Sequence, residues 1–227
     1  MIVAIDGPAG AGKSTVAQTV ARELGFQLLD TGAIYRTVAW AARQHSVDWS
    51  DADALGQLAQ GLELSFEMRG ETNTVLLRRK DSAEVTEITG QIRTPELGTG
   101  ASQVSRHHPV RAALLDLQRR IGQTGDTVVE GRDIGTVVFP NAAVKVYLTA
   151  SVDERARRRW QQLQDSNTDP MPQMDTLKDE IRQRDHRDMT RPVSPLRQAD
   201  DAHLIDATDM TQREVIDAIK ALVSAAS

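Results

Sequence analysis

Short apolar runs alternate along this chain with longer segments in which apolar residues recur at helical spacing. Strands that alternate with helices are typical of a parallel sheet with helices on both faces. The pattern therefore predicts an α/β fold. Its expected strands are 2–5, 127–130, 144–148 and 203–206, and its expected helices are about 13–24, 32–44, 152–163 and 212–223.

The segment 62–85 departs from this alternation. Two strand-like runs, 62–68 and 74–79, flank a polar stretch, so we expect a β-hairpin that turns at Gly70 and Asn73. A second polar stretch, 165–173, has the prolines and small side chains of a mobile loop. We therefore expect a core formed by 1–30, 116–150 and 192–227, an insertion at 31–115 that contains the hairpin, and a separate region at 151–191 that contains the loop.

Composition excludes several classes of protein. Hydrophobic residues make up 40% and charged residues 26%, which is typical of a soluble globular protein. The net charge of −5 argues against a general nucleic-acid binder, and the absence of cysteine excludes disulfides and cysteine-ligated zinc. Neither a signal-peptide pattern nor an apolar run of membrane length occurs. We expect a cytoplasmic protein, monomeric, with no membrane or nucleic-acid partner.

Residues 7–14 read G-P-A-G-A-G-K-S and match G-x-x-x-x-G-K-[ST] at each fixed position. The motif lies between an expected strand and an expected helix, where backbone N–H groups and the helix N-terminus can face phosphates. Lys13 would reach the β- and γ-phosphates, and Ser14 would offer its hydroxyl to Mg²⁺. The predicted ATP-binding residues are Gly7, Pro8, Ala9, Gly10, Ala11, Gly12, Lys13, Ser14 and Thr15. No base-reading N-K-x-D follows a later strand, which favours ATP over GTP.

The run D-T-G-A-I-Y-R at 30–36 follows the first expected helix. Together with A-S-Q-V at 101–104, V-R at 110–111 and E-G-R-D-I-G-T-V-V-F-P at 130–140, it makes the chain resemble the bacterial cytidylate (CMP/dCMP) kinase family. The resemblance extends to about residue 208 and includes that family's acceptor-binding insertion with short strands. It implies a P-loop NTPase-type parallel sheet flanked by helices. It also implies an enzyme that transfers the γ-phosphoryl group of ATP to CMP or dCMP with Mg²⁺.

The resemblance also implies which residues bind the acceptor. Those matched to the family's motifs are Thr31, Tyr35, Arg36, Ser102, Arg111, Arg132, Asp133, Arg184, Asp188 and Arg191. An aspartate that faces the N4 amino group of cytosine accepts a hydrogen bond that the carbonyl of uracil does not supply, so Asp133 would distinguish CMP from UMP. On residue types alone, Arg36 could be an exposed helix arginine, Tyr35 a core tyrosine, and Arg132–Asp133 a local ion pair.

Arginines crowd the segments 155–159 and 182–191, on either side of the expected loop. Like charges at this spacing lower stability unless an anion or an acidic partner offsets them, although a solvated basic helix face would also explain them. Two arginine-rich helices that bracket a loop suggest a lid over the transferring phosphates. We expect Asp188 and Arg191 to hold the acceptor's sugar or phosphate.

The residues expected to act on the phosphoryl group in transfer are Lys13, Arg132, Arg155, Arg158 and Arg187. An acceptor phosphate is already an anion, so the reaction needs positioning and charge stabilisation and no general base. Glu130 could organise Mg²⁺ through water. The alternatives are another P-loop kinase with UMP, AMP or shikimate as acceptor, or a P-loop regulatory ATPase, which would show no acceptor-dependent turnover.

Overall fold

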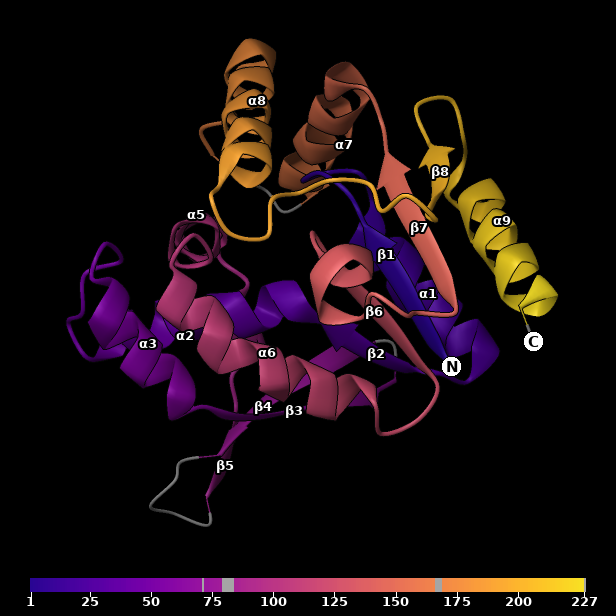
Figure 1. Cartoon of the computed structure of the whole chain (residues 1–227). Helices are drawn as coiled ribbons and strands as arrows, with labels where there is room; N and C mark the ends of the chain where they lie inside the picture. Colours follow the sequence, from indigo (N-terminus) through magenta and orange to yellow (C-terminus); the bar gives the residue numbers. More distant parts are fainter. Residues whose placement is uncertain (71, 79–83, 166–168, 227) are drawn as a thin grey trace.

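The computed structural model describes residues 1–70, 72–78, 84–165 and 169–226, and Figure 1 shows their arrangement. In chain order, the elements are β1 (Ile2–Asp6), α1 (Lys13–Leu24), β2 (Gln27–Asp30), α2 (Thr31–Gln44), α3 (Ala52–Gln60), β3 (Glu63–Arg69), β4 (Thr72–Arg78), β5 (Val85–Glu87), α4 (Thr89–Ile92), α5 (Pro95–Val104), α6 (His108–Gly122), β6 (Thr127–Gly131), the π-helical turn η1 (Ile134–Val138), β7 (Val144–Thr149), α7 (Val152–Asp165), α8 (Met174–Thr190), β8 (His203–Asp206) and α9 (Gln212–Ala225).

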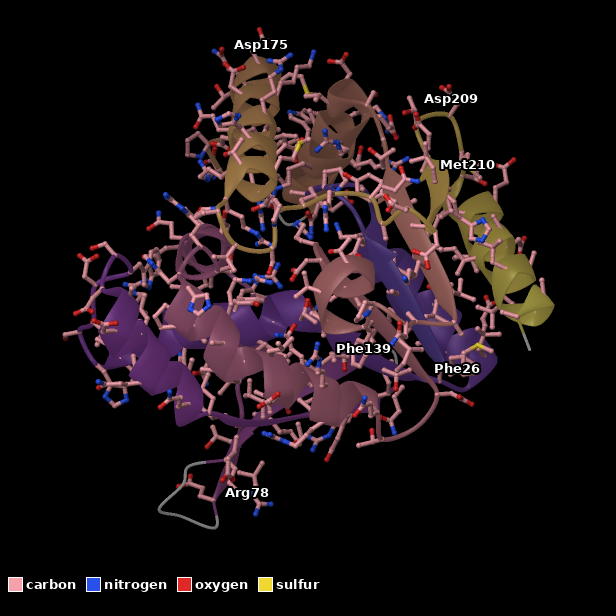
Figure 2. All side chains as sticks on the ribbon, in the orientation of Figure 1. Phe26, Arg78, Phe139, Asp175, Asp209 and Met210 are labelled. Atoms are coloured by element: carbon pink, nitrogen blue, oxygen red, sulfur yellow. The ribbon has the colours of Figure 1, made fainter. Side chains whose placement is uncertain are left out.

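A parallel sheet of five strands, in the order β2-β6-β1-β7-β8, forms the centre of the described chain. Successive residues of β1 serve opposite faces of this sheet. Ala4 belongs to a hydrophobic cluster with residues of α2, α5 and α6, whereas Val3 and Ile5 belong to a second cluster with residues of α1 and α9. Phe139, labelled in Figure 2, packs into the first cluster. The α/β prediction is therefore confirmed.

The edge strand β2 is absent from the expected elements. Gly25 ends α1 in a left-handed conformation with φ 70°, and β2 begins two residues later. With four residues and a polar first position, β2 carries too little periodicity to separate it from the preceding helix. It is held by parallel pairing with β6, in which Leu29 lies opposite Val129.

A second, antiparallel sheet of β3, β4 and β5 follows α3. Its register pairs Arg69 with Thr72 and Met68 with Asn73, so Asn73 lies within β4 and the turn predicted at Asn73 is wrong. Gly70, with φ 61°, does lie at the turn. Residues 71 and 79–83 of the predicted hairpin segment lie outside the described residues. The division into core, insertion and loop-containing region stays a prediction.

Helices α7 and α8 lie side by side above the carboxyl ends of the central strands (Figure 1). They share a small apolar cluster of Ala156, Leu177 and Ile181. Residues 166–168 of the predicted loop between the two helices lie outside the described residues. Within the described chain, every helix is too short or too polar to cross a membrane.

Candidate functional site

The phosphate-loop motif connects β1 to α1. A Cβ atom on Gly7, at φ 149°, would lie 1.9 Å from the carbonyl oxygen of Leu148 in β7, so only glycine fits there. Gly12 occupies the N-cap position of α1, which carries no side-chain cap among the described residues. The first N–H groups of α1 therefore remain available to an anionic ligand.

Lys13 is buried inside this loop, and its Nζ donates a hydrogen bond of 2.7 Å to the carbonyl oxygen of Pro8. Burial and then the neighbouring charge of Arg132 lower the pKa of Lys13 well below its usual value. A phosphate anion beside the amine would favour its charged form again. Lys13 therefore lies where its positive charge would stabilise a bound anion.

Ser14 and Glu130 meet at the start of α1. The Ser14 Oγ donates a hydrogen bond of 2.8 Å to Oε2 of Glu130, which comes from the carboxyl end of β6. Burial, followed by the charge of Asp30, raises the pKa of Glu130 to about 7. The described residues contain no group of three or more histidine, aspartate or glutamate side chains that could hold a metal. Two oxygen ligands fit Mg²⁺, which usually completes its shell with water and phosphate oxygens.

The start of α2 adjoins the same edge of the sheet. The Thr31 hydroxyl donates a hydrogen bond of 2.7 Å to the carbonyl oxygen of Glu130, and the Asp30 side chain caps α2 by accepting from Ala33 N at 3.0 Å. Arg36 Nη1 lies 3.8 Å from Asp30 Oδ2. Thr31 and Arg36, which are both predicted to bind the acceptor nucleotide, therefore lie next to the phosphate loop.

Tyr35 points into the protein beneath Arg111. The Arg111 guanidinium carbon lies 5.4 Å from the centre of the tyrosine ring, within the range of a cation–π contact. The Tyr35 hydroxyl is buried, and burial raises its pKa. The Tyr35 ring thus packs against the guanidinium group of Arg111.

Asp133 is the centre of a buried triad. Its Oδ2 forms an ion pair with Arg111, and its Oδ1 lies 3.1 Å from Arg191 Nη2. A neighbouring pair joins Arg132 Nε to Oδ2 of Asp188 at 3.0 Å. These contacts bring together residues that are up to 80 positions apart in the chain, as in the Arg111 to Arg191 span.

Ser102 joins the second of these pairs, because its Oγ donates to Oδ1 of Asp188 at 3.5 Å. Burial alone would raise the pKa of Asp188, but the charges of Arg132, Arg184 and Arg191 and the hydrogen bond from Arg132 together outweigh it, and the pKa is lowered. Three segments therefore converge here: α5, the β6–η1 connection and the end of α8. The structure places the predicted acceptor-binding residues of these segments together, at the carboxyl ends of the central strands.

Arg155 and Arg158 bind the backbone of the phosphate loop. Arg155 Nη1 donates to the carbonyl oxygen of Ala9 at 3.0 Å and pairs with Asp185 at 2.7 Å. Arg158 Nη1 donates to the carbonyl oxygen of Ala11 at 3.3 Å, and its Nε donates to Glu154 at 2.7 Å. Both arginines thus connect α7 to the loop that would cradle phosphates.

Arg184 and Arg187, on α8, have buried Nε atoms without a hydrogen-bond partner in the described part of the chain. Burial and then the charge of Arg132 lower the pKa of Arg184 to about 10. Buried side-chain N–H groups usually have a hydrogen-bond partner. These two arginines are therefore suited to receive an anion.

The sequence analysis missed three acidic residues, Asp6, Glu154 and Asp185. Glu154 and Asp185 hold Arg158 and Arg155, whereas Asp6 accepts hydrogen bonds from two backbone N–H groups of η1. Burial raises the pKa of Asp6 to about 6 despite those two bonds. A polar residue that ends an otherwise apolar strand was the available signal for Asp6.

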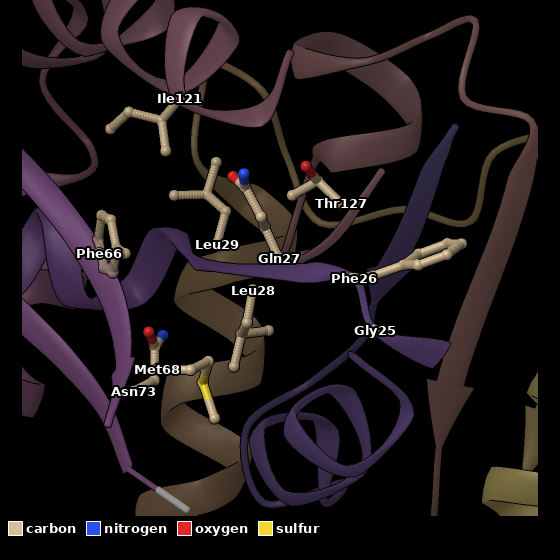
Figure 3. A pocket seen from close by; sticks show the side chains of 10 residues that line it. All are labelled: Gly25, Phe26, Gln27, Leu28, Leu29, Phe66, Met68, Asn73, Ile121 and Thr127. Carbon is tan, nitrogen blue, oxygen red and sulfur yellow. The ribbon is translucent and has the colours of Figure 1, made fainter. Parts of the chain in front are cut away.

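A separate cavity of about 210 Å³ lies at the opposite end of the sheet (Figure 3). Its lining comes from the start of β2, the start of β6, α6 and the β3–β4 hairpin, and includes Phe26, Phe66 and Ile121. None of the predicted site residues lines it. The cavity is therefore distinct from the candidate site.

Comparisons with known proteins identify the fold and the family. A solved structure of an uncharacterised protein from Eubacterium ventriosum shares the fold, with a TM-score of 0.50, 10% identity, and coverage of 99% of this chain and 98% of that one. Cytidylate kinase of Vibrio parahaemolyticus is 46% identical over 95% of this chain and 92% of the relative. That of Azotobacter vinelandii is 44% identical over 99% and 96%. The family model described as cytidylate kinase matches residues 3–225, and the chain belongs to the cytidylate kinase family.

Proposed function

We propose that this protein transfers the γ-phosphoryl group of ATP to CMP and dCMP, forming CDP and dCDP for pyrimidine nucleotide metabolism. The observation that carries the proposal is the buried Arg111–Asp133–Arg191 triad beside a complete phosphate loop. Parallel α/β sheets bind their ligands at the carboxyl ends of the strands, where both features lie. The names of the relatives support the choice of CMP.

On the donor side, residues 7–15 would wrap the ATP phosphates with backbone N–H groups, and Lys13 would neutralise the charge between the β- and γ-phosphates. The Ser14 hydroxyl and the Glu130 carboxylate, 2.8 Å apart, are the oxygens that would hold Mg²⁺. When bound, Mg²⁺ would neutralise charge on the phosphate oxygens. Arg155 and Arg158 would keep the loop in shape through its carbonyl groups.

On the acceptor side, each residue has a distinct role. Thr31, whose hydroxyl would turn from the Glu130 carbonyl oxygen to donate to phosphate, and the partly exposed Arg36 would bind the monophosphate of CMP. Ser102 and Asp133 would face the cytosine edge, and Asp133 would accept a hydrogen bond from the N4 amino group. Asp133 can do so while it binds two arginines because a carboxylate offers about four acceptor positions.

Phosphoryl transfer would rely on Arg132, Arg184 and Arg187, whose guanidinium groups would stabilise charge between the two substrates. Arg184 and Arg187 have unbonded Nε atoms among the described residues, so phosphoryl oxygens would satisfy them. Asp188 and Arg191 at the end of α8 would hold the acceptor's sugar and phosphate. Such positioned charges contribute most of the catalysis in phosphoryl transfer.

We further propose a cytoplasmic monomer whose partners are ATP, CMP and dCMP, with no membrane or nucleic acid among them. The net charge of −5 argues against a nucleic-acid partner. Sedimentation equilibrium at micromolar concentration should give a mass close to the 24.9 kDa of the chain.

The deciding assay is ADP release from Mg·ATP with CMP, dCMP, UMP, AMP or shikimate, each compared with a reaction that lacks acceptor. We expect fast turnover with CMP and dCMP, slower turnover with UMP, and none above background with AMP or shikimate. A Lys13→Met variant, which keeps the length of the side chain but not its charge, serves as the inactive control. Equal ATP hydrolysis with and without every acceptor would refute the kinase proposal and favour a regulatory ATPase.

A further inference from the structure

Asp6 is the last residue of β1 and directly precedes the phosphate loop. Its side chain is buried, with the residue only 5% exposed. One carboxylate oxygen accepts a hydrogen bond from Ile134 N and the other from Gly135 N, both at 2.8 Å. Asp6 therefore joins the donor half of the site to the turn that carries Arg132 and Asp133.

These bonds replace a missing N-cap. An aspartate at an N-cap position normally accepts a hydrogen bond from the first turn with its own side chain. Asp133 occupies that position in η1 without making such a bond, and its carboxylate pairs with Arg111 and Arg191. Because Asp6 caps η1 from the neighbouring strand, Asp133 stays free to face the arginines.

The turn has little room to take another shape. A Cβ atom on Gly131 would lie 2.6 Å from Cδ1 of Ile134 and 2.7 Å from Oγ1 of Thr31. Asp6 and Gly131 are also direct partners in the β1–β6 register. If Asp6 released the two N–H groups, the turn would move against Thr31 and Asp133, which are both on the acceptor side.

We propose that Asp6 is a positioning residue for the acceptor, which holds the β6–η1 turn so that Asp133 meets the cytosine edge. Asp6 itself lies behind the turn and acts through Ile134 and Gly135. The proposal deepens the proposed CMP phosphorylation and rests on it. It predicts that changes at Asp6 alter CMP binding and CMP selectivity more than ATP binding.

The test is steady-state kinetics of Asp6→Asn with CMP, UMP and ATP varied in turn, after wild-type turnover of CMP has been measured. The amide has one acceptor oxygen for two N–H groups, so one buried donor loses its partner. We expect the KM for CMP to rise about tenfold or more and the preference for CMP over UMP to fall. The KM for ATP should change less than about threefold.

Asp51→Asn is the matched control, because Asp51 caps α3 by accepting from Ala54 N at 3.0 Å and lies outside the site. It should leave all three constants unchanged. If wild type turns over no CMP, the proposed function fails. If wild type is active and folded Asp6→Asn keeps the wild-type KM and selectivity for CMP, the positioning role alone is refuted.

If Asp6→Asn raises the KM values for ATP and CMP equally and keeps the selectivity for CMP, the positioning role is also refuted, because a general weakening of the fold explains that result. Should Asp6→Asn fail to unfold cooperatively, Asp6→Ser replaces it, because the shorter side chain leaves room for water beside the two N–H groups. The same split between CMP and ATP is expected. Loss of cooperative unfolding in both variants would refute the proposal, because Asp6 would then serve the fold as a whole.

Discussion

Replacing Asp133 by asparagine should separate the structural and the recognition roles of the buried triad. The Asp133 side chain is 6% exposed, and its partners Arg111 and Arg191 are 7% and 3% exposed. Removing one partner of a buried ion pair costs about 3–5 kcal/mol because the remaining charge is left uncompensated. Asparagine keeps the shape and one acceptor oxygen, so we expect a loss near 3 kcal/mol.

For a chain of this size, such a loss corresponds to a fall in Tm of about 6–12 °C. Urea unfolding followed by circular dichroism would give the free energy of unfolding, and a thermal scan would give the Tm. Asp217→Asn is the control: Asp217 forms an exposed i,i+4 pair with Arg213, and its replacement should change neither quantity measurably.

Acceptor selectivity gives the second measurement on Asp133→Asn. The carboxylate can only accept, whereas the amide NH₂ can donate to the O4 carbonyl of uracil. A hydrogen bond to a charged group contributes about 1.5–3 kcal/mol, so the ratio of kcat/KM for CMP over UMP should fall at least tenfold. A variant with the expected loss of stability but the wild-type ratio would refute the assignment of Asp133 to the base. An unchanged stability would refute the triad as an energetic unit.

Three further outcomes follow from the same geometry. Glu130→Gln should remove an acid limb near pH 7 from the pH profile of kcat/KM for ATP, which reports the enzyme before Mg·ATP binds. Because the native pKa of about 7 lies above the ordinary 4.5, the native state binds this proton more tightly than the unfolded state does. Wild-type stability should therefore fall relative to the variant as pH rises between these values. Gly7→Ala should abolish ATP turnover and lower the Tm, since its Cβ would lie 1.9 Å from the Leu148 oxygen. Arg184→Met should reduce kcat at least about 100-fold in the ADP-release assay yet keep or raise the Tm, because a buried cation beside Arg132 is removed.

The glycine and arginine variants each have a matched control in the chain. Gly90→Ala adds a methyl group where no atom of the described residues lies within 4 Å, and Arg182→Met removes a largely exposed charge from α8. Both should behave as wild type. ATP turnover by Gly7→Ala, a lower Tm together with full activity for Arg184→Met, or an unshifted acid limb for Glu130→Gln would each contradict the corresponding prediction.

The sequence predicted the parts of the fold that depend on pattern alone. Strands such as β1 and β7 are short, apolar and bounded by helices, so their parallel arrangement follows from alternation. β2 was missed because a four-residue strand directly after a helix has no period of its own. Asn73 was misplaced because asparagine favours turns, whereas the register of β3 and β4 places it inside a strand.

The candidate site was predictable where the chemistry lies in a local motif. The phosphate loop needs only consecutive residues, and so could be recognised directly. The partners of the arginines could not be, because Arg155 meets Asp185 across two helices and Arg132 meets Asp188 across 56 positions. Asp6 escaped notice for the same reason, as its two hydrogen bonds reach 128 and 129 positions along the chain.

These contacts divide the arginines into two groups with different physical roles. Arg155 and Arg158 donate hydrogen bonds to backbone carbonyls of the phosphate loop and pair with carboxylates. They therefore fix the shape of the loop. Arg184 and Arg187 keep buried Nε atoms without partners among the described residues, and thus remain able to bind new anions. The first group fixes the loop, whereas in the second group burial and the charge of Arg132 lower the pKa of Arg184. A site that binds and releases phosphates needs both groups, because the fixed loop supplies the geometry and the arginines with unbonded Nε atoms supply donors and positive charge for the arriving phosphate.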